Sequence, residues 1–424
     1  MKHATQELLV RIGPGTTMGK LMRRYWIPAM LSRELPSPDC PPIRIKLMGE
    51  RLVAFRDSRS RIGLLDEFCA HRGSSLFFGR NEQGGLRCAY HGWKYDVDGK
   101  CVALPGQPSY ASKIHLTAYP CMEQGGVIWT YMGAPETKPP LPALEWSLLS
   151  PEQCYMSRRW QECNWLQALE GAIDSSHVSF LHRDEVDADP MHAEAGANHY
   201  LKADPNPVFE VKPSAGGLVI MARRAGDPGT FYWRITQYVM PWYTFIPPFA
   251  HHPLGAHAFV PMDDENTWTW NINYHADRPL EARQLAAMRD GRGIHGAVEP
   301  LTLRALANRD NDYLMDRAAQ QNGRSFSGVL GFAAQDAALQ ESMGPIQDRR
   351  REHLVQTDRA IVMARRRLFE AATASWETGV EPPGLDPAEQ RVRAGAVLLP
   401  QDIAVHTWSR TALIAAPGYP LYTV

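Results

Sequence analysis

Two short pairs of cysteine and histidine are the residues in this sequence whose types and spacing most clearly suit metal chemistry. Cys69 and His71 are separated by one residue, and Cys88 and His91 by two. Two thiolates and two imidazoles can hold a [2Fe-2S] cluster, with the cysteines on one iron and the histidines on the other. Neutral imidazoles lower the negative charge of the cluster and raise its reduction potential. These four residues therefore predict a centre that transfers single electrons.

Structural zinc and simple packing are the alternatives for the same residues. Cys2His2 sets also bind zinc, and buried cysteines often behave as small apolar side chains. Zinc motifs usually place two cysteines on one loop and two histidines on the other. Here each loop carries one cysteine and one histidine, and Gly73 and Gly92 follow them and allow tight turns. This pattern favours a Rieske-type iron–sulfur cluster over zinc.

A second candidate metal site contains His177 and His182. Two histidines and one distant carboxylate form the facial triad of non-haem Fe(II) oxygenases, which leaves positions open for oxygen or substrate. A spacing of five residues does not align two side chains on a regular helix, so we expect the helix to end or kink between Ser179 and Leu181. Asp174 precedes His177 by one helical turn, and we expect its carboxylate to accept the ring N–H and fix the tautomer.

The carboxylate of this triad must come from elsewhere in the chain. Asp336, Glu341, Asp348 and Asp358 are the candidates near the C-terminal helices. The neighbours of Asp336 are small and apolar, and a buried carboxylate there would need a cation such as a metal. Asp348 and Asp358 lie among arginines, which is typical of surface ion pairs.

Size and composition indicate a globular protein with two or three domains. The chain has 424 residues, 44% of them hydrophobic and 21% charged, with a net charge of −1. We therefore expect no overall attraction to nucleic acid or to an acidic membrane surface. The seven cysteines show no disulfide framework, and we find neither a secretory signal nor a membrane-spanning run. These features favour the cytoplasm.

The order of predicted elements indicates an α+β protein. Residues 1–26 form a helical lead-in, and residues 27–134 contain short strand runs and turns, including both cluster loops. Residues 135–154 form a proline-rich linker. Residues 155–424 follow a helix, sheet, helix order, which predicts an antiparallel sheet covered by helices. The longer helices are expected over 161–181, 280–290, 333–343 and 347–376.

The motifs resemble those of Rieske non-haem iron aromatic-ring oxygenases, large (α) subunit, over nearly the whole chain. The cluster loops read C-A-H-R-G at 69–73 and C-A-Y-H-G-W at 88–93, and residues 174–182 follow the pattern D-x2-H-x4-H. Residues 15–26 and 335–349 resemble the phthalate dioxygenase branch in particular.

This resemblance implies a β-rich Rieske domain, a helix-grip catalytic domain and a terminal oxygenase that activates O2. It implies that Asp336 is the third iron ligand, and that an NADH-dependent flavin and iron–sulfur reductase supplies electrons. The family assembles as homotrimers or stacked trimers. Asp174 would then be a catalytic residue that links His177 to His91 of the neighbouring subunit.

The preferred substrate is an aromatic acid. A carboxylate in an apolar pocket needs a cation, and the arginine fork suits it best. Three arginines on predicted strands could either bind the substrate or stabilise the sheet: Arg223, Arg224 and Arg234. Adjacent side chains of a strand face opposite ways, so at most one of Arg223 and Arg224 can enter the pocket.

The type of reaction stays open at this point. One outcome is dioxygenation, and the other is monooxygenation with O-demethylation or ether cleavage. Two other classes of protein remain as alternatives: an electron carrier or ligand-binding protein without oxygenase activity, and a zinc-stabilised binding module.

Overall fold

The computed structural model describes residues 3–192, 196 and 198–424. Residues 1–2 of the expected lead-in, and 193–195 and 197 of the expected catalytic domain, lie outside the described residues. The chain divides into a smaller unit, Ile12–Leu141, and a larger unit made of Met1–Arg11 and Pro142–Val424. One boundary falls inside the expected linker 135–154.

The expected lead-in 1–26 is divided between the two units. Helix α1 (His3–Val10) belongs to the larger unit. The Gln6 side chain explains this: it donates to the Gln347 carbonyl at 3.2 Å and accepts the Arg349 N–H at 3.0 Å. Helix α2 (Thr17–Met22) belongs to the smaller unit. Contacts made across more than 300 positions of sequence, which no local pattern records, therefore decide where this segment folds.

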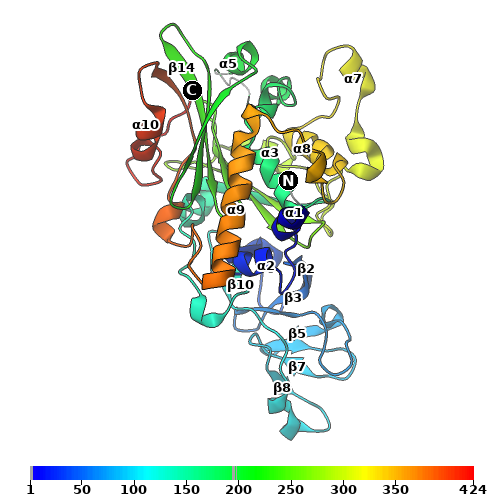
Figure 1. The fold of residues 1–424 in the computed structure, drawn as a ribbon. Coiled ribbons are helices and arrows are strands. Elements are labelled where there is room, and N and C mark those ends of the chain that lie inside the picture. The colour runs from blue at the N-terminus through cyan, green and yellow to red at the C-terminus, as the bar shows by residue number, and fades with distance from the viewer. Residues whose placement is uncertain (1–2, 193–195, 197) are drawn as a thin grey trace. The chain divides into compact units, whose positions relative to one another are not determined.

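The smaller unit is rich in short strands, as predicted (Figure 1). The strands are antiparallel and form three sheets. Their orders are β1-β10-β9, β2-β3-β4 and β5-β6-β7-β8. The strands are β1 (Trp26–Leu31), β2 (Ile43–Leu47), β3 (Glu50–Arg56), β4 (Ile62–Asp66), β5 (Arg80–Glu82), β6 (Gly85–Arg87), β7 (Lys94–Tyr95), β8 (Cys101–Ala103), β9 (Cys121–Gln124) and β10 (Val127–Tyr131). The loops that carry the cluster residues follow β4 and β6.

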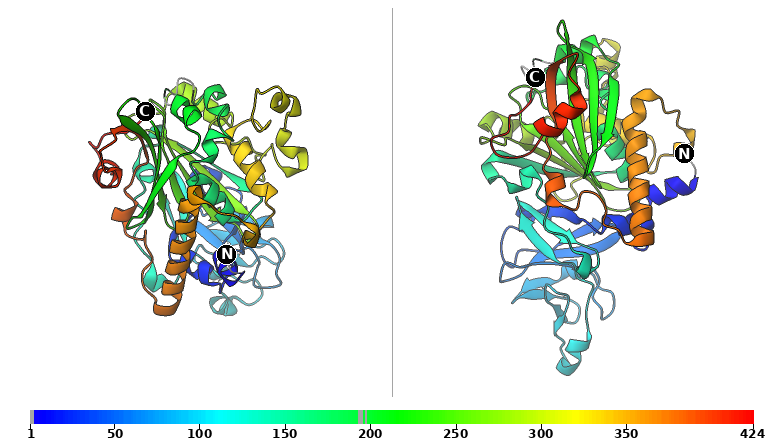
Figure 2. Two further views of the ribbon diagram at one scale, coloured as in Figure 1. Left: turned by 45° about the horizontal axis from the view of Figure 1, so that its top comes forward. Right: turned by 60° about the vertical axis from the view of Figure 1, so that its left-hand side comes forward.

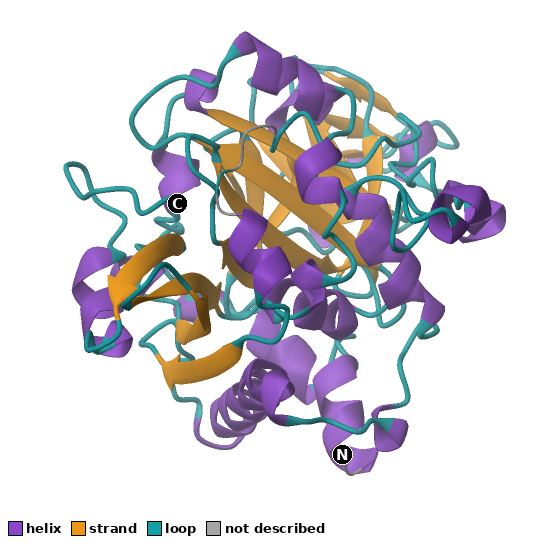
Figure 3. Ribbon diagram, turned by 90° about the horizontal axis from the view of Figure 1, so that it is seen from above, coloured by secondary structure: helices purple, strands orange, loops and turns teal. Residues whose placement is uncertain are grey.

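The larger unit is built on one antiparallel sheet in the order β11-β17-β16-β15-β14-β13-β12, with β18 paired to β14. The strands are β11 (Cys154–Gln161), β12 (Val208–Pro213), β13 (Gly217–Ala225), β14 (Thr230–Val239), β15 (Tyr243–Ile246), β16 (Leu254–Pro261), β17 (Thr267–Tyr274) and β18 (Gly395–Pro400). Figure 3 shows these strands as one block with helices packed alongside. The predicted sheet with helices is confirmed.

Helices cover the sheet of the larger unit on both sides. Besides α1, the described helices of the larger unit are α3 (Trp165–Ile173), α4 (Glu185–Ala188), α5 (Asn198–Ala203), α6 (Ala282–Arg289), α7 (Arg317–Gln321), α8 (Phe332–Ser342), α9 (Arg359–Thr378) and α10 (Val405–Ala412). Helix α9 contacts β12, β13 and α3, and Figure 2 shows α9 and α10 on opposite sides of the sheet. None of the helices in the described part of the chain has both the length and the apolar character needed to cross a bilayer.

Alternation along β14 separates the core side of the sheet from the side that forms a cavity. Trp233 and Ile235 pack with Val405 of α10, whereas Arg234 and Thr236 line the cavity. Successive side chains of a strand face opposite ways, so the strand register decides which residues reach the site.

Two of the predicted helices are shorter than expected. Helix α3 ends at Ile173 rather than near residue 180. The cause is Asp174, whose backbone is extended (φ −91°, ψ 106°) and whose Oδ1 accepts the Ser176 N–H at 2.7 Å; this side-chain bond replaces the helical one. The helix expected over 347–376 begins only at Arg359, because residues 349–351 and 356–358 form 3-10 turns.

A buried ion cluster fastens α3 to α9. Glu170 of α3 receives hydrogen bonds from Arg349 at 3.0 Å and from Arg365 of α9 at 2.6 Å. Arg365 also pairs with Glu352 at 2.6 Å. Burial alone would raise the pKa of Glu170, but the two guanidinium groups outweigh it and lower that pKa. The helix that precedes the candidate iron ligands is therefore held by charges from distant segments.

Candidate metal centres

The two cluster loops of the smaller unit fold alike. The Gly73 N–H donates to the Cys69 carbonyl at 2.9 Å, and the Gly92 N–H donates to the Cys88 carbonyl at 3.0 Å. Both glycines have positive φ, +71° and +75°, a conformation that side chains disfavour. The glycine turns expected from the sequence are present, and each one brings a cysteine and a histidine to the same loop.

The four candidate cluster ligands are arranged by type. Cys69 and Cys88 are each 2% exposed, whereas His71 and His91 are exposed at the surface. The two imidazole rings lie 4.4 Å apart, and His71 stacks on Trp93 at 4.6 Å. Two buried cysteines and two exposed histidines fit a [2Fe-2S] cluster that would be held by thiolates on one iron and imidazoles on the other.

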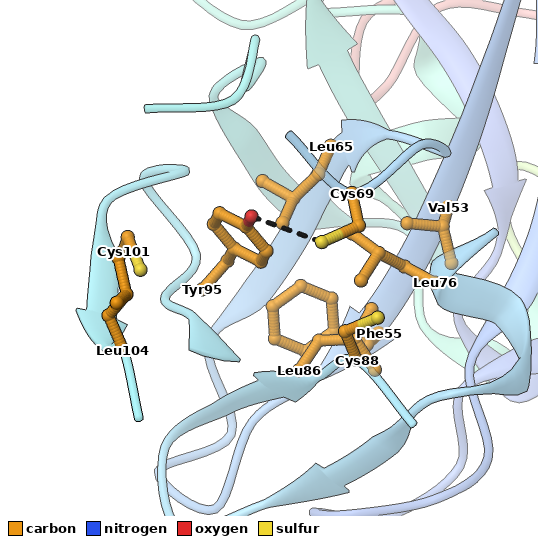
Figure 4. Packing of buried hydrophobic residues seen from close by; sticks show 10 residues of the cluster. All are labelled: Val53, Phe55, Leu65, Cys69, Leu76, Leu86, Cys88, Tyr95, Cys101 and Leu104. Atoms are coloured by element: carbon orange, nitrogen blue, oxygen red, sulfur yellow. Dashed lines mark hydrogen bonds between the residues drawn. The ribbon is translucent and has the colours of Figure 1, made fainter. Parts of the chain in front are cut away.

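Tyr95 is a neighbour of the cluster site that the sequence did not reveal. Its hydroxyl lies 3.3 Å from the Cys69 sulfur, inside an apolar core (Figure 4). Burial and the contact with Cys69 raise the pKa of Tyr95 well above its usual value, so the hydroxyl stays protonated. Where Cys69 is a thiolate ligand, its sulfur has no proton, and the Tyr95 hydroxyl would be the donor. Hydrogen bonds to the sulfurs are among the factors that set the potential of an iron–sulfur cluster.

We expect Tyr95→Phe to lower the reduction potential of the cluster by roughly 40 mV. The lost hydrogen bond is worth about 1 kcal/mol, and for a one-electron couple a tenfold change in the equilibrium constant corresponds to about 59 mV. A redox titration followed by the visible spectrum measures this shift. Tyr110→Phe, at a residue 46% exposed in the same unit, is the matched control. An unchanged potential in Tyr95→Phe would show that the hydroxyl does not act on the cluster.

The candidate iron ligands of the larger unit come together from two segments. His177 and His182 lie after α3, and Asp336 lies on α8. Asp336 Oδ1 is 3.4 Å from His182 Nε2 and 3.7 Å from His177 Nε2, and the three ligand atoms lie within 4.8 Å of one another. Burial opposes ionisation of Asp336, but the two histidines outweigh it and lower its pKa to about 2. Two imidazoles and one ionised carboxylate are the donor set of a facial-triad Fe(II) site.

The other carboxylates considered for the third ligand have different partners. The Glu341 carboxylate accepts the Tyr313 hydroxyl at 2.7 Å and the Glu162 N–H at 3.1 Å. Asp348 pairs with Arg350 at 2.7 Å, and Asp358 accepts the Val355 N–H at 2.7 Å.

Gln335 positions His182, and sequence reasoning missed it. The Nδ1–H of His182 donates to Gln335 Oε1 at 2.7 Å, and Gln335 Nε2 donates to the Val329 carbonyl at 2.8 Å. This bond leaves Nε2 of His182 as the metal-binding nitrogen. The one indication in the sequence was that Gln335 directly precedes the candidate ligand Asp336.

Asp174 lies near His177 but does not form the predicted hydrogen bond with it. Its Oδ2 is 3.8 Å from His177 Nδ1, longer than a hydrogen bond, and Nδ1 has no hydrogen-bond partner among the described residues. Asp174 Oδ1 accepts the Ser176 N–H instead. The carboxylate is 25% exposed, so it can also reach a group outside the subunit.

The triad opens into a cavity whose empty volume is about 1120 Å³, including space open to solvent. Apolar side chains from the sheet and from the helices cover much of its wall, among them Val178, Ile246, Phe249, Phe259 and Phe332. Such walls suit an aromatic ring.

Of the three arginines expected to bind substrate, the structure brings Arg234 to the cavity. Arg234 is 3% exposed, donates to the Pro247 carbonyl at 2.9 Å and stacks on Phe249. Arg223 lies over Phe231, outside the cavity wall. Arg224 braces the histidine segment, donating to the Ser175 carbonyl at 2.8 Å. The opposite directions expected for Arg223 and Arg224 are observed, but neither of them reaches the cavity.

Arg159 is a cavity arginine that sequence reasoning missed. It lies on β11, lines the cavity and is 4% exposed. Its neighbour Arg158 faces the other side and lies 4.1 Å from the Trp268 ring. The run Arg158-Arg159 gave no indication of which residue faces inward.

Comparison with known proteins matches the segments that contain the two candidate sites. The family model described as "Rieske [2Fe-2S] domain" matches residues 25–120, and "LigXa C-terminal domain like" matches residues 130–405. The 3-chlorobenzoate-3,4-dioxygenase oxygenase subunit of Comamonas testosteroni is 40% identical over 94% of this chain and 95% of its own length. The phthalate 4,5-dioxygenase oxygenase subunit of Pseudomonas putida is 35% identical over 98% of both chains.

Solved structures share the fold. Dicamba monooxygenase bound to 3,6-dichlorosalicylic acid superposes with a TM-score of 0.60, covering 84% of this chain and 99% of that chain at 17% identity. At that identity, the likeness concerns the arrangement of the two units' elements and not the substrate.

Proposed function

The chain belongs to the Rieske non-haem iron oxygenases, as the terminal oxygenase subunit of a multicomponent oxidoreductase, and on this basis we propose that it hydroxylates a carboxylated aromatic compound. The observation that carries the proposal is a two-histidine, one-carboxylate triad at an apolar cavity that also contains the buried cations Arg159 and Arg234. The names of both relatives contain an aromatic acid, which supports the same substrate class.

The family carries a Rieske cluster and a mononuclear iron, and the donor sets here fit both. We propose that Cys69, His71, Cys88 and His91 hold the cluster, and that His177, His182 and Asp336 hold the mononuclear iron. When bound, the cluster supplies single electrons and the iron supplies the open coordination positions at which O2 reacts.

The protein's own side chains prepare this chemistry. Gln335 keeps Nδ1 of His182 protonated and directs Nε2 toward Asp336. The apolar wall excludes water from the ring of the substrate, and Arg224 holds the backbone of the histidine segment in place through Ser175. A buried cation holds a carboxylate most strongly where water is excluded, because the local dielectric is low.

We propose that electrons cross between neighbouring subunits of a homotrimer through Asp174, which lies 3.8 Å from His177 and would accept a hydrogen bond from the neighbour's His91. The exposure of His91 and the partly exposed carboxylate of Asp174 support this arrangement. A cytoplasmic NADH-dependent flavin and iron–sulfur reductase would deliver the electrons.

We expect Asp174→Asn to lower turnover by roughly 10-fold to 100-fold. An amide carries no negative charge beside His177 and is a weaker acceptor for an imidazole N–H of the neighbouring subunit. Rapid-reaction kinetics would show slow oxidation of the cluster, while iron content and cluster spectrum stay normal. Asp277→Asn, at a side chain 60% exposed, controls for the loss of a charge. Normal cluster oxidation in Asp174→Asn would exclude the bridging role.

A substrate screen tests the proposed function. The oxygenase is combined with reductase, NADH and a set of aromatic acids and their amides, and oxygen uptake and product mass are recorded. A gain of two oxygen atoms identifies a dioxygenase, whereas release of formaldehyde or a phenol identifies a monooxygenase that demethylates or cleaves an ether. Turnover of uncharged arenes alone would exclude a carboxylated substrate.

A further inference from the structure

Arg159 has hydrogen-bonding capacity that the described protein does not use. Its Nε and Nη1 atoms are buried and have no hydrogen-bond partner among the described residues. The side chain is 4% exposed and forms part of the cavity wall. Buried polar atoms almost always have partners, and a buried cation is costly without an anion. Unused donors on a cavity arginine therefore indicate a ligand that accepts hydrogen bonds.

The acceptors around Arg159 are committed to other groups. The two oxygens of Glu341 accept from Glu162 and Tyr313, and the carboxylate of Asp336 faces the two histidines. Burial lowers the pKa of Arg159 although the charges of Glu341 and Asp336 oppose this shift.

The polar side chains beside Arg159 also bond to one another. The Thr269 hydroxyl donates to Gln161 Oε1 at 2.8 Å, and Gln161 Nε2 donates to Gln340 Oε1 at 2.6 Å. Gln161 Oε1 and Gln340 Oε1 therefore both have donors of their own, and neither amide oxygen bonds to Arg159.

Asn271 adds a third unused donor on the same face of the sheet. Arg159 pairs with Thr269 in the register of β11 and β17, and Asn271 is two residues further along β17. Residues in this diagonal relation are roughly 7–8 Å apart and within reach of long side chains. Asn271 is 1% exposed and lines the cavity, and its Nδ2 has no partner among the described residues.

The oxygen of Asn271 is occupied. It accepts from His257 Nδ1 at 2.9 Å, so the amide is oriented with its nitrogen free. Burial lowers the pKa of His257 to about 4, and this ring is neutral at neutral pH. Of Arg159 and His257, therefore, only Arg159 is charged at neutral pH. The side-chain atoms of Arg159 and Asn271 that have no partner are all hydrogen-bond donors.

We propose that Arg159 and Asn271 form the subsite that binds the carboxylate of the aromatic substrate. This inference rests on the proposed function and names the residues that recognise its substrate class. The planar guanidinium fork matches a carboxylate, and the Asn271 amide supplies a further N–H. Arg159 and Asp336 line the same cavity, so a carboxylate bound at Arg159 keeps the attached ring in the cavity that contains the candidate iron ligands.

Arg234 differs from Arg159 in this respect. Two of its nitrogens already donate, one to the Pro247 carbonyl at 2.9 Å and one to the Tyr232 hydroxyl at 3.3 Å. Its guanidinium also stacks on Phe249 at 4.8 Å. Arg234 therefore has hydrogen-bond partners within the protein, and it lines the cavity and adds positive charge there. Arg159 instead has two N–H donors without a partner among the described residues.

Calorimetric titration of the oxidised holoenzyme with 3-chlorobenzoate and with 3-chlorobenzamide tests this subsite. Arg159→Gln should weaken 3-chlorobenzoate binding on the order of 100-fold and change 3-chlorobenzamide binding less than about threefold, because only the carboxylate loses a charged partner. Arg159→Lys should recover part of the loss. Arg223→Gln, outside the cavity wall, should bind both compounds as the unsubstituted protein does.

Asn271→Asp supplies a second variant if Arg159→Gln does not fold. It places a negative charge beside the bound carboxylate and should weaken 3-chlorobenzoate binding at least tenfold while sparing the amide. Equal binding of 3-chlorobenzoate by Arg159→Gln and the unsubstituted protein would overturn the subsite, as would selective loss in Arg234→Gln alone. If the unsubstituted protein binds the amide and no carboxylate, both the proposed substrate class and this subsite are wrong.

Discussion

His177→Ala is expected to abolish product formation, with a loss of at least about 1,000-fold, while the visible spectrum of the iron–sulfur cluster stays unchanged. Among the described residues, the imidazole is one of three metal-binding groups that converge on the candidate iron position, and metal activation contributes several kcal/mol to catalysis. The cluster residues belong to the other unit of the chain, so the two centres should respond independently. Product yield, iron content and the cluster spectrum are measured on the same preparation.

His199→Ala is the control for this experiment. His199 lies on α5 of the same unit and is exposed, so its removal should change neither iron content nor turnover. If His177→Ala lost the cluster colour, the division of the metal ligands between the two sites would be wrong. If the variant kept full activity, the mononuclear site would have to lie elsewhere.

Glu170→Gln is expected to destabilise the larger unit by roughly 3–5 kcal/mol, because removal of one partner leaves buried charge uncompensated. Arg349 is fully buried and Arg365 nearly so, and Glu170 accepts from both. A neutral amide cannot balance two guanidinium groups. Urea unfolding followed by tryptophan fluorescence measures the change, and the cluster spectrum reports separately on the smaller unit.

Glu370→Gln is the matched control, since Glu370 also pairs with an arginine of α9 but lies at the surface, 57% exposed. Exposed ion pairs contribute little, and the unfolding midpoint of this variant should not move. If Glu170→Gln were as stable as the unsubstituted protein, solvent or another carboxylate would have to compensate the charges of Arg349 and Arg365 in place of Glu170.

The sequence alone determined the two metal-binding motifs and the class of protein. Cys69, His71, Cys88 and His91 lie within short loops, so their spacing already limits how the four side chains meet. His177 and His182 are equally local. The alternation of strand-forming runs and helices also sufficed for the fold class, because burial periodicity is a local property of the chain.

Only the tertiary structure decided which distant residues join these motifs. Asp336 is one of four candidate carboxylates in the sequence and is singled out by the family resemblance, and packing between elements brings it to the two histidines. Gln335 and Tyr95, which were not predicted, reach the candidate metal sites in the same way, and α1 joins the larger unit through its contacts with residues 347–349. The choice between Arg158 and Arg159, or between Arg223, Arg224 and Arg234, depends on strand register and on which face of the sheet the helices cover. A shift of one residue reverses every side chain of a strand, and no local pattern records that choice.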